Sequence, residues 1–139
     1  MKQELQNKLF EKYPKIFSQK DLSAQETAMC WGVTCGDGWY TLIDTLCGNI
    51  KNRVDNFNRF KPEEAWMSCQ ATQVKEKYGG LRFYTEGGDD EIDGMISMAE
   101  SMSYHICSEC AKPSVPQKGR GWIYTLCSEC QAERELGGK

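Results

Sequence analysis

The chain has 139 residues, of which 40% are hydrophobic, and a formal net charge of −3. This length predicts one domain, because two independent domains of half the size would each bury too little surface. Residues 1–60 carry eight basic and seven acidic side chains, and residues 61–139 carry nine and thirteen. The balance excludes a strongly basic nucleic-acid binder.

The N-terminal sequence MKQELQNKLFEKYPKIF carries charged or amide side chains throughout and lacks the apolar segment of a signal peptide. No stretch reaches the roughly 18 apolar residues that cross a bilayer. We therefore expect a cytoplasmic protein that does not bind a membrane. In that reducing compartment, the eight cysteines indicate metal ligands and buried thiols rather than disulfides.

The first element expected is a short helix over residues 3–13 that Pro14 should end. Ile16 and Phe17 are expected to pack beneath the body of the protein. Residues 18–36 show no clear period, and we expect a loop with a short turn there.

A longer helix is expected over residues 38–59, with Asp37 as its N-cap and Pro62 beyond its end. Its apolar side chains recur at helical spacing and form one continuous stripe. The stripe consists of Ile43, Leu46, Cys47, Ile50, Val54 and Phe57. We expect this helix to be the spine of the domain.

The segment VKEKYGGLRFY predicts a β-hairpin, because Gly79-Gly80 is a two-residue turn signal between runs of β-forming residues. With these glycines as the turn, Tyr78 would face Leu81. Alternation of side chains then predicts one polar face of the hairpin. That face consists of Lys75, Lys77, Arg82 and Tyr84.

Two interpretations of this polar face remain open. Lys77 and Arg82 would be directly opposed, which is unfavourable unless an anion lies over them, and this favours a phosphate or an acidic partner surface. Alternatively, its charges pair internally with Glu63, Glu64 or the acidic cluster of residues 89–91.

The acidic cluster suits the N-terminus of a second helix through the helix dipole. The apolar residues that follow it repeat at helical spacing. They are Ile92, Met95, Ile96, Ala99 and Met102.

The phrase CSEC occurs twice and predicts a zinc site. Cys107 and Cys110 form one C-x2-C pair, and Cys127 and Cys130 form a second pair after sixteen residues. This spacing is typical of one tetrahedral zinc ion and fits an iron–sulfur cluster less well. Four thiolates leave no coordination position for a reactive water, so we expect a structural metal and no enzymatic activity.

The sequence around the second pair indicates how the site is built. GWIYTLC is strand-like, and SECQAEREL is rich in helix formers and closes at two glycines. The predicted fold class is α+β, with two core helices and a β-hairpin followed by a C-terminal treble-clef-like zinc module. One domain over residues 1–139 would comprise an N-terminal helix and loop (1–29), a helix, hairpin and helix core (30–104) and the zinc module (105–139).

The remaining cysteines and the only histidine have weaker interpretations. His105 could be a fallback ligand or a general base, but without an acidic motif around it we expect a residue beside the metal or on the surface. Four irregularly spaced cysteines favour buried thiols over a second zinc site or a redox pair. They are Cys30, Cys35, Cys47 and Cys69.

Three phrases together resemble a group of small, largely uncharacterised bacteriophage and bacterial proteins. They are CGDGWYTLIDTLC, VKEKYGGLRFY and GWIYTLCSEC, and the likeness covers about residues 30–132. The resemblance implies a bacteriophage or prophage setting and a zinc site. It supplies no catalytic residue.

We therefore expect a non-enzymatic, zinc-stabilised protein that binds another protein, such as a phage accessory factor or an inhibitor of a host defence system. The alternative is a nucleic-acid-binding zinc protein that uses the hairpin face together with Lys118 and Arg120 of the linker beside Trp122. A nuclease would need metal-binding acids such as Asp37, Asp44 and Glu76, whose spacing does not favour that activity.

Overall fold

The computed structural model describes residues 1–118 and 122–137 of the chain. This part of the chain is a mixed α+β structure. Its helices are α1 (Gln3–Lys12), α2 (Tyr40–Asn58), α3 (Asp90–Ser103) and α4 (Ser128–Leu136). Its strands are β1 (Val33–Thr34), β2 (Cys69–Lys77), β3 (Gly80–Gly87), β4 (Val115–Lys118) and β5 (Ile123–Leu126).

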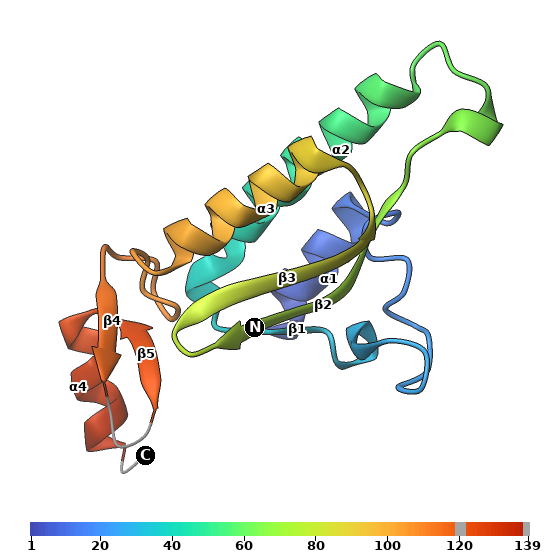
Figure 1. Ribbon diagram of the computed structural model, residues 1–139. Coiled ribbons are helices and arrows are strands. Elements are labelled where there is room, and N and C mark those ends of the chain that lie inside the picture. The colour runs from blue at the N-terminus through green and yellow to red at the C-terminus, as the bar shows by residue number, and fades with distance from the viewer. Residues whose placement is uncertain (119–121, 138–139) are drawn as a thin grey trace.

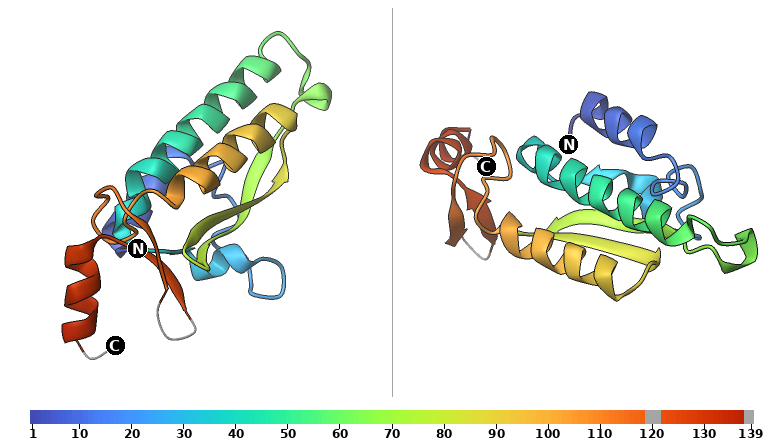
Figure 2. Two further views of the ribbon diagram at one scale, coloured as in Figure 1. Left: turned by 60° about the vertical axis from the view of Figure 1, so that its left-hand side comes forward. Right: turned by 90° about the horizontal axis from the view of Figure 1, so that it is seen from above.

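Two small sheets divide the strands. The first has the order β1-β2-β3, with β1 parallel to β2 and β2 antiparallel to β3, and the second pairs β4 with β5. Helices α2 and α3 lie side by side against the first sheet, and α1, α2 and α3 follow one another across the molecule when it is seen from above (Figures 1 and 2). The second sheet and α4 lie beyond the tip of the β2–β3 hairpin (Figure 1).

The core lies between the first sheet and the three helices, because each contributes one apolar face. Its fully buried side chains come from every part of this layer. They include Leu9, Phe17, Met29, Val33, Trp39, Ile43, Ile50, Val74, Leu81 and Ile92. Within the described residues, no helix is both long enough and apolar enough to cross a membrane.

The N-terminal part confirms one expectation and overturns another. Helix α1 ends before Pro14, and Ile16 and Phe17 are buried as expected. Residues 18–36 are not only a loop, because they contain the 3-10 helix η1 (Ala28–Trp31) and strand β1. Strand β1 has only two residues and pairs with distant β2, so no local alternation could reveal it.

Helix α2 lies within the expected range, but its beginning differs from the prediction. Asp37 is not its N-cap, because a 3-10 helix η2 (Asp37–Trp39) precedes α2 and Trp39 is the capping residue. The Asp37 carboxylate instead accepts a hydrogen bond from the Lys2 amide at 2.7 Å. A tertiary contact with the beginning of α1 has therefore replaced the local cap.

The hairpin exists, but the predicted register is wrong. Tyr78 and Gly79 occupy the turn with φ of 54° and 84°, and Lys77 pairs with Gly80. Gly80 is the first residue of β3, and this position needs glycine because a Cβ there would overlap the Tyr104 ring. Lys75, rather than Lys77, consequently lies opposite Arg82.

Helix α3 begins as expected and protects the edge of the sheet. The Asp89 side chain caps α3 by accepting a hydrogen bond from the Ile92 amide at 3.1 Å. On the outer edge of β3, the Leu81 and Phe83 amides donate to Ser103 Oγ and Glu100 Oε2 at 2.8 and 2.9 Å. These side chains satisfy backbone donors that an exposed edge strand would leave open to another chain.

Candidate metal centre

The first cysteine pair lies on a tight knuckle that follows α3. Ile106 and Pro113 form an isolated antiparallel bridge, and the Cys107 amide donates to the Lys112 carbonyl at 2.8 Å. Ala111 closes the turn with a φ of 71°. This turn directs the side chains of Cys107 and Cys110 toward one point.

The second pair lies at the N-terminus of α4. Cys127 is the N-cap, and its sulfur accepts a hydrogen bond from the Cys130 amide at 3.5 Å. This bond, together with the neighbouring cysteine side chains, lowers the pKa of Cys127 to about 7. The helix N-terminus also favours an anionic sulfur, so the second pair has the local structure that the sequence predicted.

The four cysteine sulfurs form one cluster in which each lies within 4.8 Å of the others. Cys110 Sγ and Cys127 Sγ are 3.5 Å apart. Tetrahedral zinc with Zn–S bonds of about 2.3 Å would place neighbouring sulfurs about 3.8 Å apart, so the donor set fits such an ion. Among residues 1–118 and 122–137, this is the one group of three or more potential ligands gathered in this way.

The protonation of the cluster shows why a cation suits it. Desolvation and the neighbouring sulfurs of Cys127, Cys110 and Cys107 raise the pKa of Cys130, whereas the pKa of Cys127 is lowered. Ionising one thiol makes the next harder to ionise, because thiolates repel at this distance. A divalent cation removes that conflict and stabilises all four thiolates together.

The segment GDGW forms the first of two contacts that hold the metal module, which we define as residues 105–118 and 122–137. The Gly38 amide donates to the Ser108 carbonyl at 2.8 Å, and the buried Trp39 indole donates to the Ile106 carbonyl at 2.8 Å. A Cβ on Gly38 would overlap the Cys107 carbonyl oxygen. We call this contact the GDGW seat.

The tip of the β2–β3 hairpin forms the second contact, which we call the hairpin seat. The buried Thr125 hydroxyl donates to the Gly79 carbonyl. A Cβ on Gly79 would lie only 3.1 Å from Ile123 Cγ2, and one on Gly80 would overlap Tyr104. The GDGW segment and the YGG turn therefore both pack against the metal module. The sequence alone did not predict these contacts.

The predicted polar hairpin face is present, although its pairing differs. Lys75, Lys77, Arg82 and Tyr84 share one face of the sheet, which we call the basic sheet face. Arg82 Nη2 donates to the Tyr104 hydroxyl at 3.2 Å, so this guanidinium is held against the knuckle side of the molecule. The Lys118 side chain and Arg120 lie outside the described residues.

Two of the acids proposed as internal partners for that face, Asp89 and Glu91, pair with Arg53 instead, at 2.7 and 3.1 Å. Among the ion pairs between described residues, none involves Lys75 or Lys77. The face therefore keeps two cations available to a ligand.

The remaining cysteines and the histidine are separate from the cluster. Cys35, Cys47 and Cys69 are buried and Cys30 is half-buried. Burial raises the pKa of Cys35 to about 12 and also raises the pKa of Cys47, which keeps both thiols neutral. His105 is exposed, as the sequence favoured.

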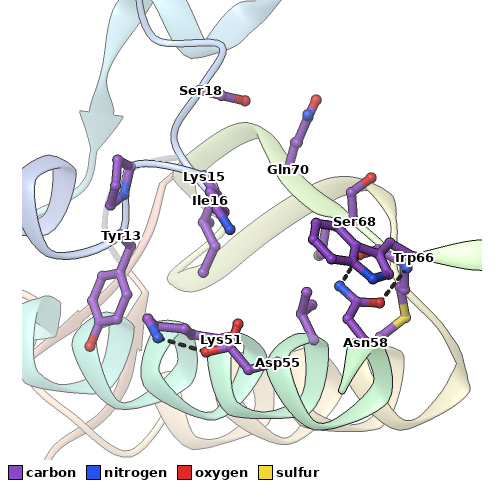
Figure 3. A pocket seen from close by; sticks show the side chains of 14 residues that line it. Tyr13, Lys15, Ile16, Ser18, Lys51, Asp55, Asn58, Trp66, Ser68 and Gln70 are labelled. Atoms are coloured by element: carbon purple, nitrogen blue, oxygen red, sulfur yellow. Dashed lines mark hydrogen bonds and ion pairs between the residues drawn. The ribbon is translucent and has the colours of Figure 1, made fainter. Parts of the chain in front are cut away.

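A surface cavity of about 440 Å³ lies between the end of α1, helix α2 and the beginning of β2. Figure 3 shows Tyr13 and Trp66 on opposite sides of it, with Lys51 and Asp55 along α2. Its polar groups are largely engaged, because Lys51 pairs with Asp55 at 2.7 Å and Asn58 bonds the Met67 backbone. The lining is mainly apolar, and its acid Asp55 is held by the ion pair with Lys51.

The loop beside this cavity carries aromatic side chains that sequence reasoning did not single out as a pair. We call residues 59–68 the aromatic loop, and it extends beyond the sheet (Figure 1). Phe60 is 98% exposed and has a φ of 67°, and Trp66 is 49% exposed. The sequence alone does not predict this exposure, because phenylalanine and tryptophan side chains are more often buried.

No protein-family model matches the chain, and comparisons with curated proteins and with solved structures find no match. The metal cluster and the surfaces must therefore be interpreted from their own geometry.

Proposed function

We propose that the chain is a non-enzymatic, zinc-stabilised protein that binds another protein through its aromatic loop. The observation that carries this proposal is Phe60, whose ring is 98% exposed on a backbone with a φ of 67°. Large aromatic side chains dominate the binding energy of protein interfaces. A left-handed backbone is unfavourable for phenylalanine, and an exposed ring adds nothing to the core, so Phe60 does not serve the stability of the fold.

Trp66 extends this surface. Its indole N–H donates to the Lys61 carbonyl at 2.8 Å, which holds the half-exposed ring in place beside the cavity. A fixed aromatic ring loses little conformational entropy when a partner covers it. Phe60 and Trp66 would then insert into, or be covered by, apolar sites of the partner.

In this proposal the metal is one structural zinc ion. Four cysteine ligands complete a tetrahedron and leave no open position for a reactive water. The knuckle, the β4–β5 hairpin and α4 carrying Cys127 and Cys130 together support a treble-clef-like module. The zinc would hold this module on its two seats, and the partner would bind elsewhere.

The resemblance to bacteriophage proteins supports a host protein as the partner. A phage accessory factor or an inhibitor of a host defence system acts by covering a surface of its target, and it needs no catalytic group. This role agrees with an apolar cavity lined by engaged polar groups.

Affinity capture from host lysate tests the proposal. The parent chain, Phe60→Gly, Trp66→Ala and the control Leu136→Ala are each used as bait, with nuclease treatment throughout. We expect one host protein to bind the parent and the control and to be lost with both aromatic variants. Loss of a hot-spot side chain should weaken the purified complex roughly thirtyfold or more. Capture that neither aromatic change affects contradicts the proposal.

A second candidate function is binding of single-stranded nucleic acid by the basic sheet face. The observation that favours it is the direct opposition of Lys75 and Arg82, which an anion between them would relieve. Tyr84 on the same face could stack on a base.

Fluorescence anisotropy with a labelled oligonucleotide tests this candidate. Affinity should fall steeply between about 50 and 200 mM salt. With about three phosphate contacts, a plot of the logarithm of the affinity against the logarithm of the salt concentration should have a slope of roughly −2. Changing both Lys75 and Arg82 to Ala should flatten that slope. Affinity that is insensitive to salt excludes the candidate.

A further inference from the structure

Helix α3 carries two apolar stripes, of which one is buried in the core and the other is only partly covered, with Met95 packed against the core. The inner stripe lies in the core and consists of Ile92, Ile96, Ala99 and the small polar Ser103. The outer stripe, which we call the methionine stripe, consists of Met95, Met98 and Met102 at i, i+3 and i+7. Met98 is 66% exposed and Met102 is 43% exposed. The spacing is that of a seam prepared for another helix.

The methionine stripe borders a groove of about 490 Å³ between α2 and α3. Helix α2 lines the groove with uncharged side chains, and Ala111 of the knuckle lies in its lining. The α2 contribution consists of Thr41, Leu42, Thr45, Leu46 and Asn49. A ridge of side chains from another helix can enter such a groove, and methionine side chains adapt to the shape of the helix that fills it.

The two ends of the stripe decide which helix fits. Glu91 continues it four residues before Met95. His105 lies three residues after Met102 in the turn that follows α3, and its backbone amide donates to the Met102 carbonyl at 2.9 Å. The Glu91 side chain is 63% exposed and uses only one carboxylate oxygen to pair with Arg53. Exposed His105 has an imidazole N–H that can donate to a carboxylate.

This order of side chains is nearly symmetric about its centre. Glu91 and His105 each lie seven residues from Met98, and Met95 and Met102 lie three and four residues from it. A stripe with an acceptor at one end and a donor at the other is complementary to an inverted copy of itself. A helix of unrelated sequence has no such built-in match.

We propose that two copies of the chain associate through this stripe, with the two α3 helices antiparallel and a two-fold axis at Met98. Met98 then meets Met98 of the partner subunit, and Met95 meets Met102 of the partner subunit. The Glu91 carboxylate accepts a hydrogen bond from His105 of the partner subunit. The helical part of the seam, from Glu91 to Met102, is about 17 Å long.

The direction follows from charge. In a parallel pair, Glu91 would lie against Glu91 of the partner subunit, beside further acids at the beginning of α3. Like charges in such positions repel, whereas antiparallel helices also align their dipoles favourably. The antiparallel arrangement is therefore the one that the ends of the stripe select.

Sedimentation velocity of the zinc-loaded full chain tests the association between about 1 and 100 μM. We expect a dimer that Met98→Glu converts to a monomer, whereas Leu136→Glu, a change at another exposed apolar residue, leaves it intact. Circular dichroism should show that both variants remain folded. A monomeric parent at 100 μM, or a dimer that survives Met98→Glu, overturns the proposal.

Thiol cross-linking tests the geometry with diamide as the oxidant and the parent chain as the control. Met98→Cys should form a covalent dimer, because equivalent residues on a two-fold axis approach within disulfide range. Met95→Cys mixed with Met102→Cys should also cross-link, whereas each of these variants alone should not. Cross-linking of Met95→Cys with itself indicates a parallel pair and overturns the arrangement.

Discussion

The two seats of the metal module and the aromatic loop lie at opposite ends of the sheet, and they use their unusual residues in opposite ways (Figure 1). At the seats, Gly38, Trp39 and Thr125 are engaged with another part of the chain. In the aromatic loop, Phe60 contacts mostly solvent and has a left-handed backbone. Packing thus explains the residues at the two seats. It does not explain the exposed Phe60, so the aromatic loop is the better candidate for a binding surface.

This comparison predicts that changes at the metal module and its seats reduce stability, whereas changes in the aromatic loop reduce binding and leave stability almost unchanged.

Removing a metal ligand should have the largest effect. Cys110→Ser or Cys127→Ser should lower zinc content and the melting temperature together, by roughly 10 °C or more, because binding of a structural metal contributes directly to folding. Atomic absorption and calorimetry measure both quantities, and a chelator should reproduce the loss in the parent. Half-buried Cys30→Ser is the matched control and should retain zinc. A ligand variant that melts like the parent with its zinc retained contradicts the assignment.

The GDGW seat should tolerate no added methyl group. Gly38→Ala should lower the free energy of unfolding by about 2–3 kcal/mol, because its Cβ would overlap the Cys107 carbonyl. Gly94→Ala is the control, since a Cβ on this α3 glycine meets nothing within 4 Å. It should raise stability by about 0.5–1 kcal/mol. Equal urea midpoints for the two variants would show that the seat is not a tight contact.

A smaller effect is expected at the contact between α1 and α2. Buried Tyr13 donates to Asp44 Oδ1 at 2.7 Å, so Tyr13→Phe should cost about 1 kcal/mol at neutral pH. Burial, followed by the bond to Asp44, raises the pKa of Tyr13 from 10.0 to about 12. The neutral phenol therefore stabilises the folded state below pH 10, and this contribution is lost as pH rises toward 12.

The difference in stability between the parent and Tyr13→Phe should consequently shrink between pH 10 and pH 12. Urea unfolding across this range measures it. Tyr78→Phe, in the exposed turn, is the control and should show no such difference. A gap that stays constant with pH would mean that the Tyr13 hydroxyl does not titrate in this window.

The aromatic loop should show the smallest loss of stability. Phe60→Gly removes an exposed ring and suits a φ of 67°, so the free energy of unfolding should change by less than about 0.5 kcal/mol. The same change should abolish capture of the partner protein. A large loss of stability would place Phe60 among the packed residues and remove the contrast between the two regions.

Local signals were sufficient wherever neighbouring residues determine the structure. The spacing of the cysteines, the apolar period of α2 and the acidic cluster at the beginning of α3 are each visible in short stretches of sequence, and the sequence predicted all three. Asp37 shows the limit of such signals. It has a good capping side chain, but a hydrogen bond from Lys2 occupies it.

The hairpin shows the same limit more fully. The sequence YGG admits a turn at Gly79-Gly80 or at Tyr78-Gly79, and local propensity favours the former. The structure has the latter, and the Tyr104 ring occupies the space where a Cβ of residue 80 would lie. In either register the same four side chains lie on the basic sheet face. The predicted face is therefore confirmed, although Lys75 and not Lys77 lies opposite Arg82.

The sequence by itself determined that four cysteines form a metal-type cluster and that two amphipathic helices and a hairpin accompany it, because those features follow from spacing and period. Only the tertiary structure decided that GDGW and YGG are seats for the metal module, that Phe60 is exposed and that Met98 and Met102 of α3 are left exposed. Burial and close backbone approach depend on residues distant along the chain. The two proposed binding surfaces, the aromatic loop and the methionine stripe, therefore could not be told from core residues by the local sequence pattern.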